Sequence, residues 1–398
     1  MDVKPGYKRT EVGVIPEEWE VRRLGEVGNF LKGSGVKKDE ANSGELPCIR
    51  YGEIYTHHND YIRSFNSWVS RAVADQATRL RKGDIVFAGS GETKKEIGKC
   101  VAFVNNFEAF AGGDTVILRP RAQPTEVDAL FLGYLLNTPA IATQKASQGQ
   151  GDAVVHISAK ALASIFVPLP PLPEQCAIAA ALSDVDALLD GLDRRIAKQR
   201  DVKQAAMQQL LTGRTRLPGF RGEWEVRRLG EVAEIKTGSR NNEDKSTDGE
   251  YPFFVRSEQI ERIDTYSYDC EAILVPGEGR IGNIFHYVNG RFDVHQRVYA
   301  ITQFTDGVAG RFVHLYMSQF FGAWAMQNTV KATVDSLRLP TFQMFGLPIP
   351  PLPEQRAIAE ALSDMDAALE ALEARREKTR ALKQAMMQDL LTGRVRLV

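Results

Sequence analysis

The stretch Pro168-Leu-Pro-Pro-Leu-Pro-Glu-Gln175 decides the fold, because it returns as Pro348-Ile-Pro-Pro-Leu-Pro-Glu-Gln355. The segment after each stretch is also repeated at the same offset of 180 residues, and it ends in Leu210-Leu-Thr-Gly-Arg214 and in Leu390-Leu-Thr-Gly-Arg394. The 50 residues from Pro168 and the 50 from Pro348 share 33 identities. Self-similarity of this strength indicates a duplicated structural unit.

A second repeat lies upstream of each variable region. Glu18-Trp-Glu-Val-Arg-Arg-Leu-Gly-Glu-Val27 is copied letter for letter at Glu223 to Val232, at an offset of 205 residues. Each copy of the unit therefore has a start motif, a variable region, a Pro-rich hinge and a repeated tail. We divide the chain into a first α/β domain (1–167), a central helix (168–217), a second α/β domain (218–347) and a C-terminal helix (348–398).

Each repeated tail is predicted to form one long helix. Pro173 and Pro353 suit a first helical turn, and Gly213 and Gly393 stand where a C-terminal stop is expected. The intervening residues, roughly 38, would span roughly 57 Å. An apolar stripe with 4-3 spacing runs through Ile178, Leu182, Val185, Leu189, Leu192 and Ile196, and its copy runs through Ile358, Leu362, Met365, Leu369 and Leu372. This spacing is typical of a coiled coil.

The charges predict how the two helices pair. Residues 174–190 contain four acids and no bases, whereas residues 191–217 contain seven bases and two acids. The second tail repeats the pattern, with five acids and one base in 354–370 and seven bases and three acids in 371–397. Parallel helices would place like charges together, so we expect an antiparallel coiled coil.

The variable regions, about 28–167 and 233–347, contain short β-rich runs broken by Gly, Asn and Asp and followed by a helical stretch. Three landmarks correspond by sequence: residues 32–35 with 236–239, 49–54 with 255–260, and 85–91 with 273–279. The predicted fold class is α+β: two copies of one α/β domain with different loops, separated by the two long helices, in a pseudo-two-fold repeat. A constant framework with varied loops is typical of a recognition domain whose specificity differs from copy to copy.

Composition narrows the function classes. Lys and Arg number 50 and Asp and Glu number 51, so the net charge of −1 does not by itself favour binding to a polyanion. The four cysteines are far apart and form no CxxC pair, which disfavours a zinc knuckle or a disulfide scaffold. The sequence has no run of apolar residues long enough to span a membrane and no signal peptide, so we expect a cytoplasmic protein.

Motifs for catalysis are missing from the sequence. HExxH, P-loop, GxSxG and the Asn/Asp-Pro-Pro-Tyr/Phe motif of amino-methyltransferases do not occur. Gly277-Glu-Gly-Arg-Ile-Gly282 fits GxGxxG, but the residues after it are predicted to form a strand, so we interpret it as a β-turn rather than a dinucleotide site. The six histidines have no metal-ligand spacing. We therefore expect no catalytic residue, no metal and no cofactor in this chain.

The layout resembles the specificity subunit of type I restriction–modification systems over essentially the whole chain. The resemblance is carried by the start at Tyr7-Lys-Arg-Thr-Glu-Val-Gly-Val-Ile-Pro-Glu-Glu-Trp19, and by both copies of Trp-Glu-Val-Arg-Arg-Leu-Gly-Glu, of Pro-Pro-Leu-Pro-Glu-Gln and of Leu-Leu-Thr-Gly-Arg. It is the combination, in this order and twice, that is specific.

The resemblance implies a non-catalytic subunit with two target-recognition domains, each reading one half of a bipartite site in double-stranded DNA. It implies that the helices set the gap and dock two methyltransferase subunits, which bind S-adenosylmethionine and methylate adenine N6. Restriction subunits that use ATP with Mg could join. A 57 Å helix corresponds to about 17 base pairs, which suits two half-sites and a gap.

Candidate DNA-binding residues follow from loop position and residue type, because Lys and Ser can hold phosphates while Arg, Asn and Gln can read base edges. In the first domain they are Lys32, Ser34, Lys37 and Lys38, then Arg50 and Tyr51, then Lys94, Lys95 and Lys99, then Gln150 and His156. In the second they are Lys236, Ser239, Arg240 and Asn241, then Arg256, Ser257 and Gln259, then Arg280 and Asn283, then Gln296, Arg297 and Lys331.

Two alternative functions belong to other classes of protein, an enzyme and an adaptor. A self-sufficient DNA methyltransferase or nuclease would need the catalytic motifs that the sequence lacks. A non-catalytic coiled-coil adaptor with two ligand-binding domains would share the architecture but would not bind duplex DNA, even with partner subunits.

Overall fold

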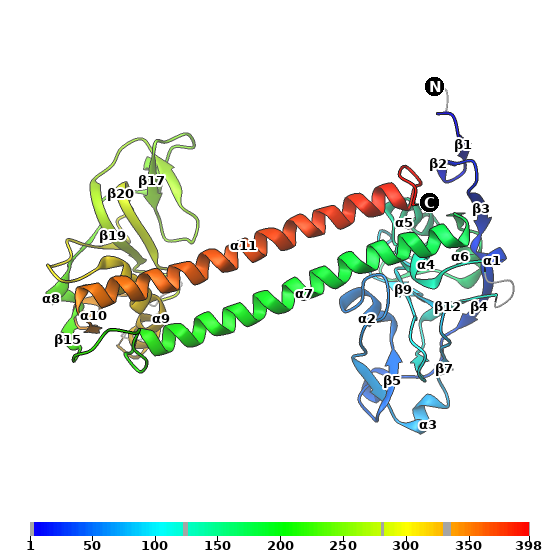
Figure 1. The fold of residues 1–398 in the computed structure, drawn as a ribbon, viewed down its shortest axis with the longest axis horizontal. Helices are drawn as coiled ribbons and strands as arrows, with labels where there is room; N and C mark the ends of the chain where they lie inside the picture. Colours follow the sequence, from blue (N-terminus) through cyan, green and yellow to red (C-terminus); the bar gives the residue numbers. More distant parts are fainter. Residues whose placement is uncertain (1–3, 122–125, 280–281, 329–335, 398) are drawn as a thin grey trace. The chain divides into compact units, whose positions relative to one another are not determined.

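The computed structural model describes residues 4–121, 126–279, 282–328 and 336–397. The chain forms two compact units, which we call unit 1 (residues 1–191 and 375–398) and unit 2 (residues 192–374). Each unit combines one α/β domain with parts of both long helices (Figure 1).

The α/β domain of unit 1 is built on two four-stranded sheets, with strand orders β10-β8-β12-β4 and β6-β5-β11-β7, and on three strand pairs, β1-β2, β14-β3 and β13-β9. Its strands are β1 (Tyr7–Thr10), β2 (Gly13–Pro16), β3 (Glu20–Arg23), β4 (Gly28–Lys32), β5 (Leu46–Ile49), β6 (Ser67–Val69), β7 (Thr78–Arg79), β8 (Ile85–Ala88), β9 (Ser90–Gly91), β10 (Cys100–Ala102), β11 (Phe110–Ala111), β12 (Thr115–Pro120), β13 (Val155–His156) and β14 (Phe166–Leu169). Its helices are α1 (Leu24–Val27), η1 (Lys38–Glu40), α2 (Tyr51–Thr56), α3 (Arg71–Ala74), α4 (Ala129–Leu136), α5 (Pro139–Gln148) and α6 (Ala159–Ala163).

The α/β domain of unit 2 has one six-stranded sheet of order β16-β21-β19-β20-β17-β18 and the pair β15-β22. Its strands are β15 (Glu225–Arg228), β16 (Glu234–Thr237), β17 (Tyr251–Phe254), β18 (Glu261–Ile263), β19 (Tyr268–Pro276), β20 (His286–Val294), β21 (Val298–Thr302) and β22 (Gly346–Ile349). Its helices are α8 (Leu229–Val232), η2 (Asn242–Asp244), α9 (Gly310–Asn328) and α10 (Leu339–Gln343). Both domains therefore mix strands and helices, as predicted.

The repeated tails form helices α7 (Leu172–Leu210) and α11 (Leu352–Leu390), each of 39 residues. Both end before a glycine in the left-handed region, Gly213 with φ 68° and Gly393 with φ 71°. A side chain at such a φ would be strained, which explains why glycine stops the helix in both copies. The prediction of one long helix in each repeated tail is confirmed.

The helices pair antiparallel within each unit, as the charge pattern predicted. In unit 1, Lys383 of α11 binds Asp186 of α7 at 2.9 Å. In unit 2, the equivalent Lys203 of α7 forms an ion pair with Asp366 of α11. Each pair joins the basic half of one helix to the acidic half of the other. The apolar stripe packs as expected: Ile178 and Leu182 join the core of unit 1 beside Leu390 and Leu391, and Ile358 and Leu362 join that of unit 2 beside Leu210 and Leu211.

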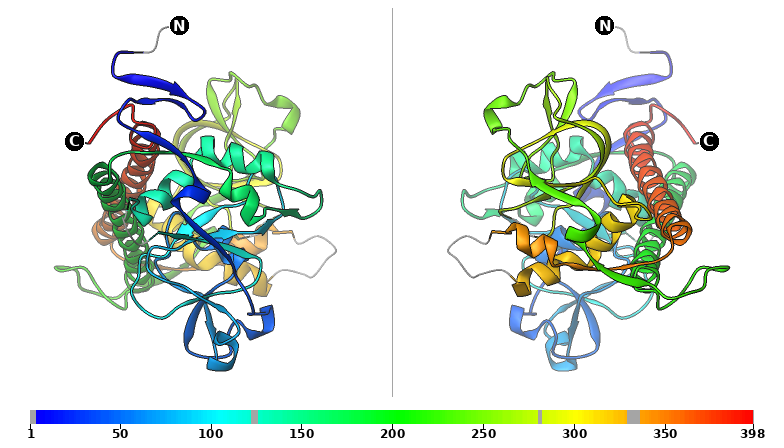
Figure 2. Two further views of the ribbon diagram at one scale, coloured as in Figure 1. Left: turned by 90° about the vertical axis from the view of Figure 1, so that its right-hand side faces the viewer. Right: turned by 90° about the vertical axis from the view of Figure 1, so that its left-hand side faces the viewer.

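The repeated motifs meet one another at the start of each long helix. In unit 1, the Trp19 indole donates to Glu174 at 3.1 Å, and Arg396 binds the same carboxylate at 2.9 Å. The β1–β2 hairpin lies at this end of α11 (Figure 2), where the Tyr7 hydroxyl donates to Gly393 O at 3.0 Å. The start motif, the Pro-Glu-Gln motif and the Leu-Thr-Gly-Arg segment thus form one cluster of contacts, which we call the motif cluster.

Unit 2 contains a second copy of the motif cluster. The Trp224 indole donates to Glu354 at 3.3 Å, and Arg216 donates to the same carboxylate at 2.6 Å. The neighbouring Gln355 accepts from Ala309 N at 2.8 Å, as Gln175 accepts from Asp128 N at 2.9 Å in unit 1. The internal repeat is therefore a repeat of contacts as well as of letters.

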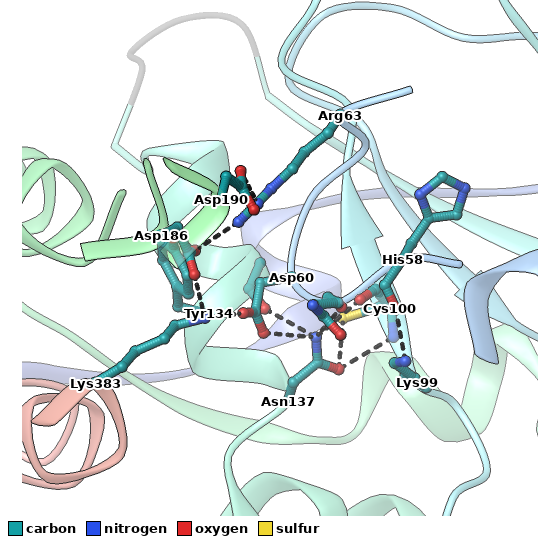
Figure 3. A network of polar contacts seen from close by, with 12 residues as sticks. His58, Asp60, Arg63, Lys99, Cys100, Tyr134, Asn137, Asp186, Asp190 and Lys383 are labelled. Atoms are coloured by element: carbon teal, nitrogen blue, oxygen red, sulfur yellow. Dashed lines mark hydrogen bonds and ion pairs between the residues drawn. The ribbon is translucent and has the colours of Figure 1, made fainter. Parts of the chain in front are cut away.

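A buried polar network holds α11 against the first domain (Figure 3). The Lys383 ammonium lies 2.9 Å from both Asp60 and Asp186, and the Tyr134 hydroxyl donates to Asp186 at 2.7 Å. Burial alone would lower the pKa of Lys383, but the two carboxylates outweigh it, so the pKa is raised and the charge is retained. Arg63 binds Asp186 at 3.1 Å. No helix in the described part of the chain is long and apolar enough to cross a membrane.

Candidate nucleic-acid interface

The candidate interface of the first domain is organised around the short strand β9. Gly89 N donates to Asp114 O at 2.8 Å, and Ile157 N donates to Gly89 O at 3.0 Å. These backbone bonds place β9 beside β13, so that Ser90 pairs with His156. The Ser90 hydroxyl lies 2.9 Å from Nδ1 of His156.

The second domain repeats this backbone arrangement with other side chains. Gly277 N donates to Arg297 O at 2.8 Å, and Leu337 N donates to Gly277 O at 2.8 Å. Glu278 forms an antiparallel bridge with Ser336. Glu278 is therefore the structural counterpart of Ser90, a position that we call the Gly-X-Gly position in both domains.

Three sequence-predicted residues of the first domain meet at one pocket of about 340 Å³ beside the Gly-X-Gly position. Lys32 comes from β4, while Gln150 and His156 come from the segment before α6. The other polar residues of the lining are Ser90, Asp114, Thr115, Gln148 and Ser158. The pocket thus gathers a base, an acid and several hydrogen-bonding groups from four distant parts of the chain.

In the second domain two of the predicted arginines, Arg256 and Arg297, converge on Glu278. Arg297 Nη1 lies 3.0 Å from its carboxylate, and Arg256 Nη1 lies 3.6 Å from it. Arg256 and Ser257 also line a pocket of about 380 Å³ with Glu278. These groups come from β17–β18, from the end of β19 and from the turn before β21.

The other predicted residues of the first domain fall into two groups. The exposed ones are Ser34, Lys37, Lys38, Tyr51, Lys94 and Lys95. Arg50 and Lys99 are partly buried and engaged within the domain: Arg50 binds Glu53 at 3.3 Å, and Lys99 donates to His58 O at 2.7 Å (Figure 3). Burial lowers the pKa of Lys99.

The second domain shows the same division. Besides Arg256 and Arg297, the exposed predicted residues are Lys236, which pairs with Glu234, and Ser239, Asn241, Ser257, Gln259, Asn283 and Gln296. Gln296 donates to the Asn241 side chain, so these two act together. Arg240 is partly buried and binds the buried Asp293 at 3.0 Å. Arg280 and Lys331 lie outside the described residues.

The backbone corrects two of the three landmark correspondences by one residue. Gly112 N donates to Ile49 O, and the equivalent His295 N donates to Phe254 O, so Ile49 corresponds to Phe254 and not to Val255. The basic loop likewise matches at Gly33 and Gly238, whose amides donate to the equivalent carbonyls of Thr115 and Val298, so Lys32 corresponds to Thr237 and not to Lys236. Matching letters misled the alignment because strand register is set by backbone pairing. The correspondence of 85–91 with 273–279 is confirmed.

Sequence reasoning missed Ser90, Asp114 and Glu278. A signal was present, because Gly-Ser-Gly and Gly-Glu-Gly occupy the same place in the third landmark. A different polar residue between two glycines that both domains share indicates a fixed backbone with a variable side chain.

Comparison with known proteins gives a consistent assignment. The family model described as the type I restriction modification DNA specificity domain matches twice, over residues 16–199 and 221–380. The MjaVIII specificity subunit of Methanocaldococcus jannaschii, a type I restriction enzyme subunit, is 23% identical over 423 aligned positions, covering 96% of this chain and 94% of that protein. The EcoKI specificity subunit of Escherichia coli is 24% identical over 205 positions, which cover 50% of this chain and 43% of that one.

Solved structures show the same fold. The S subunit of a type I restriction–modification system from M. genitalium superimposes with a TM-score of 0.64 at 16% identity, covering 98% of both chains. The HsdS subunit from Thermoanaerobacter tengcongensis gives a TM-score of 0.50 at 19% identity, covering 96% of this chain and 98% of that one. With the family model matching most of the chain in two copies, this chain belongs to the type I restriction–modification DNA specificity family.

Proposed function

We propose that each α/β domain of this chain reads one half of a bipartite site in double-stranded DNA. The observation that carries the proposal is the Gly-X-Gly position, where one backbone arrangement presents Ser90 in the first domain and Glu278 in the second. Each contacts an exposed side chain, His156 or Arg297. Two copies of one frame with different hydrogen-bonding groups suit two different half-sites.

The long helices set the spacing and dock the catalytic subunits in this proposal. Each helix has 39 residues without a break, and each offers an exposed apolar side chain at the same repeat position, Val202 in α7 and Leu382 in α11. Equivalent apolar contacts on both helices favour two identical partners.

The partners that we propose are two methyltransferase subunits that bind S-adenosylmethionine and methylate adenine N6. Restriction subunits that use ATP with Mg are a further proposed addition, and the complex would act in the cytoplasm. The chain itself would contribute recognition and no catalytic residue. Its net charge of −1 supports a division of labour in which the methyltransferase subunits share the phosphate contacts.

The test is assembly followed by DNA binding. We expect native mass spectrometry of this chain co-purified with its methyltransferase subunit to show two methyltransferase copies per chain. Val202→Asp and Leu382→Asp should each reduce this to one copy, and the double variant to none, because each places a charge at one contact. Equal loss of both copies by either single variant would contradict two equivalent docking sites.

DNA binding by the assembled complex gives the second readout. The affinity for duplex DNA should fall steeply as salt rises, because phosphate contacts release counterions. Failure of the full complex to bind any duplex at low salt would overturn the proposed function and favour the adaptor.

A further inference from the structure

The side chain at the Gly-X-Gly position is held more deeply than the side chain that it contacts. Ser90 is only 4% exposed, whereas its partner His156 is exposed. The Glu278 side chain is 28% exposed, whereas that of its partner Arg297 is 58% exposed. In both domains a partly or fully buried polar group therefore fixes an exposed one.

The backbone around the Gly-X-Gly position makes the same contacts in both domains, so the different side chains, Ser90 and Glu278, do not reflect a different backbone. The amides of Gly89 and Gly277 both donate, over 2.8 Å, to the carbonyl of the residue just before a neighbouring strand of the sheet, which is β12 in the first domain and β21 in the second. At the X position the side chain changes from the hydroxyl of Ser90 to the carboxylate of Glu278. The exposed partner comes from a different place in each copy: His156 lies in β13, where the second domain has Ser336, and Arg297 occupies the position of Asp114. A folding role alone would be met by the backbone bonds, which both copies retain.

The chemistry of each exposed partner suits a base edge. A guanidinium can donate two parallel hydrogen bonds to O6 and N7 of guanine, and the hydrogen bond from Arg297 to Glu278 uses one of its nitrogens, Nη1. In the first domain the contact with Ser90 engages Nδ1 of His156, which directs a base contact to Nε2. Fixing a long side chain before binding reduces the entropy lost on binding.

We infer that Ser90 and Glu278 are positioning residues for base reading, that His156 and Arg297 are the side chains they orient, and that the second domain's half-site contains a guanine read by Arg297. This inference rests on the proposed function and goes beyond it, because it names one residue pair for each half-site.

The experiment maps N6-methyladenine genome-wide in a host that expresses this chain with its methyltransferase subunit. Ser90→Ala should relax one base position in one half-site, with discrimination lower by roughly tenfold, and Ser90→Thr should restore it. Glu278→Gln and Arg297→Ala should relax a guanine in the other half-site. Exposed residues give matched controls, Ser164→Ala in the first domain and Glu225→Gln in the second, and both should leave the motif unchanged.

The outcomes distinguish a failure of this inference from a failure of the proposed function. An unchanged motif in Ser90→Ala and Glu278→Gln, with a normal motif from the wild-type chain, would overturn the inference alone. Loss of both half-sites together in either variant would indicate a merely structural role and would also overturn it. The absence of any two-part motif with the wild-type chain would overturn the proposed function itself.

Discussion

Removing the charge of Lys383 tests how the first domain is held against α11. Its ammonium lies 2.9 Å from both Asp60 and Asp186. The three side chains are only 12%, 9% and 5% exposed. In Lys383→Met, the apolar chain length is kept, but two buried carboxylates lose their shared cation.

The burial of the ion pair determines how much unfolding free energy we expect each substitution to cost. Breaking a buried ion pair by removing one partner costs about 3–5 kcal/mol, because the remaining charge stays buried. The repeat supplies a matched control in Lys203→Met, since Lys203 occupies the equivalent position in α7. Its side chain is 23% exposed and that of its partner Asp366 is 34% exposed. Solvent can compensate this wetter pair, so its loss should cost about 1 kcal/mol or less.

Hydrogen exchange followed by mass spectrometry can read the two units separately within one chain. In Lys383→Met we expect faster exchange in peptides from residues 175–191, with little change in peptides from 352–374. In Lys203→Met we expect a much smaller change, located in unit 2. Equal losses of protection in the two variants would refute the reasoning that burial decides the cost.

Three further predictions concern pH, spacing and phosphate contacts. Burial, with Arg311 adding to it, lowers the pKa of His314 from 6.5 to about 4, so below pH 6.5 the unfolded chain takes up a proton that the folded chain does not, and stability falls with falling pH. The loss in unfolding free energy from pH 7.5 to pH 5 should exceed that of His314→Gln by about 2 kcal/mol, and equal losses in urea titrations would contradict the assignment. Deleting one heptad from each long helix, residues 192–198 and 372–378, removes about 10.5 Å of helix and should shorten the gap in the methylated motif by about 3 base pairs; an unchanged gap would show that the helices do not set it. Replacing both Lys94 and Lys95 by Gln should weaken binding to all duplexes alike and make the salt dependence of binding shallower, whereas an altered base preference in a binding-site selection would show that they read bases.

The fold was predictable where the sequence repeats. The offset of 180 residues fixed the two helices, their glycine stops and, through the charge pattern, their antiparallel pairing. These features depend on the spacing of apolar residues and on the distribution of charge along each tail, and both can be read directly from the sequence. Asp186 illustrates what was hidden: it lies between positions of the apolar stripe, yet it is buried because Lys383, Arg63 and Tyr134 reach it from other elements.

The candidate site was predictable only in part. Residue type and loop position identified His156, Arg256 and Arg297, which the structure brings to the Gly-X-Gly positions. Glu278 was missed because a carboxylate does not suggest DNA binding until the arginines are seen to converge on it. The letter-based alignment of the β5 and β17 regions failed by one residue because only backbone hydrogen bonds define their register.

The most direct measurement is binding of the assembled complex to synthetic duplexes that carry the methylated motif, with each half scrambled separately. If each domain reads one half, scrambling either half should lower the affinity by orders of magnitude, and changing the gap by one base pair should do the same with both halves intact. Exchange of residues 233–343 for the same region of a relative with another motif should change one half-site only. Undiminished affinity after scrambling one half, or a change in both halves after the exchange, would contradict the assignment of one domain to each half-site.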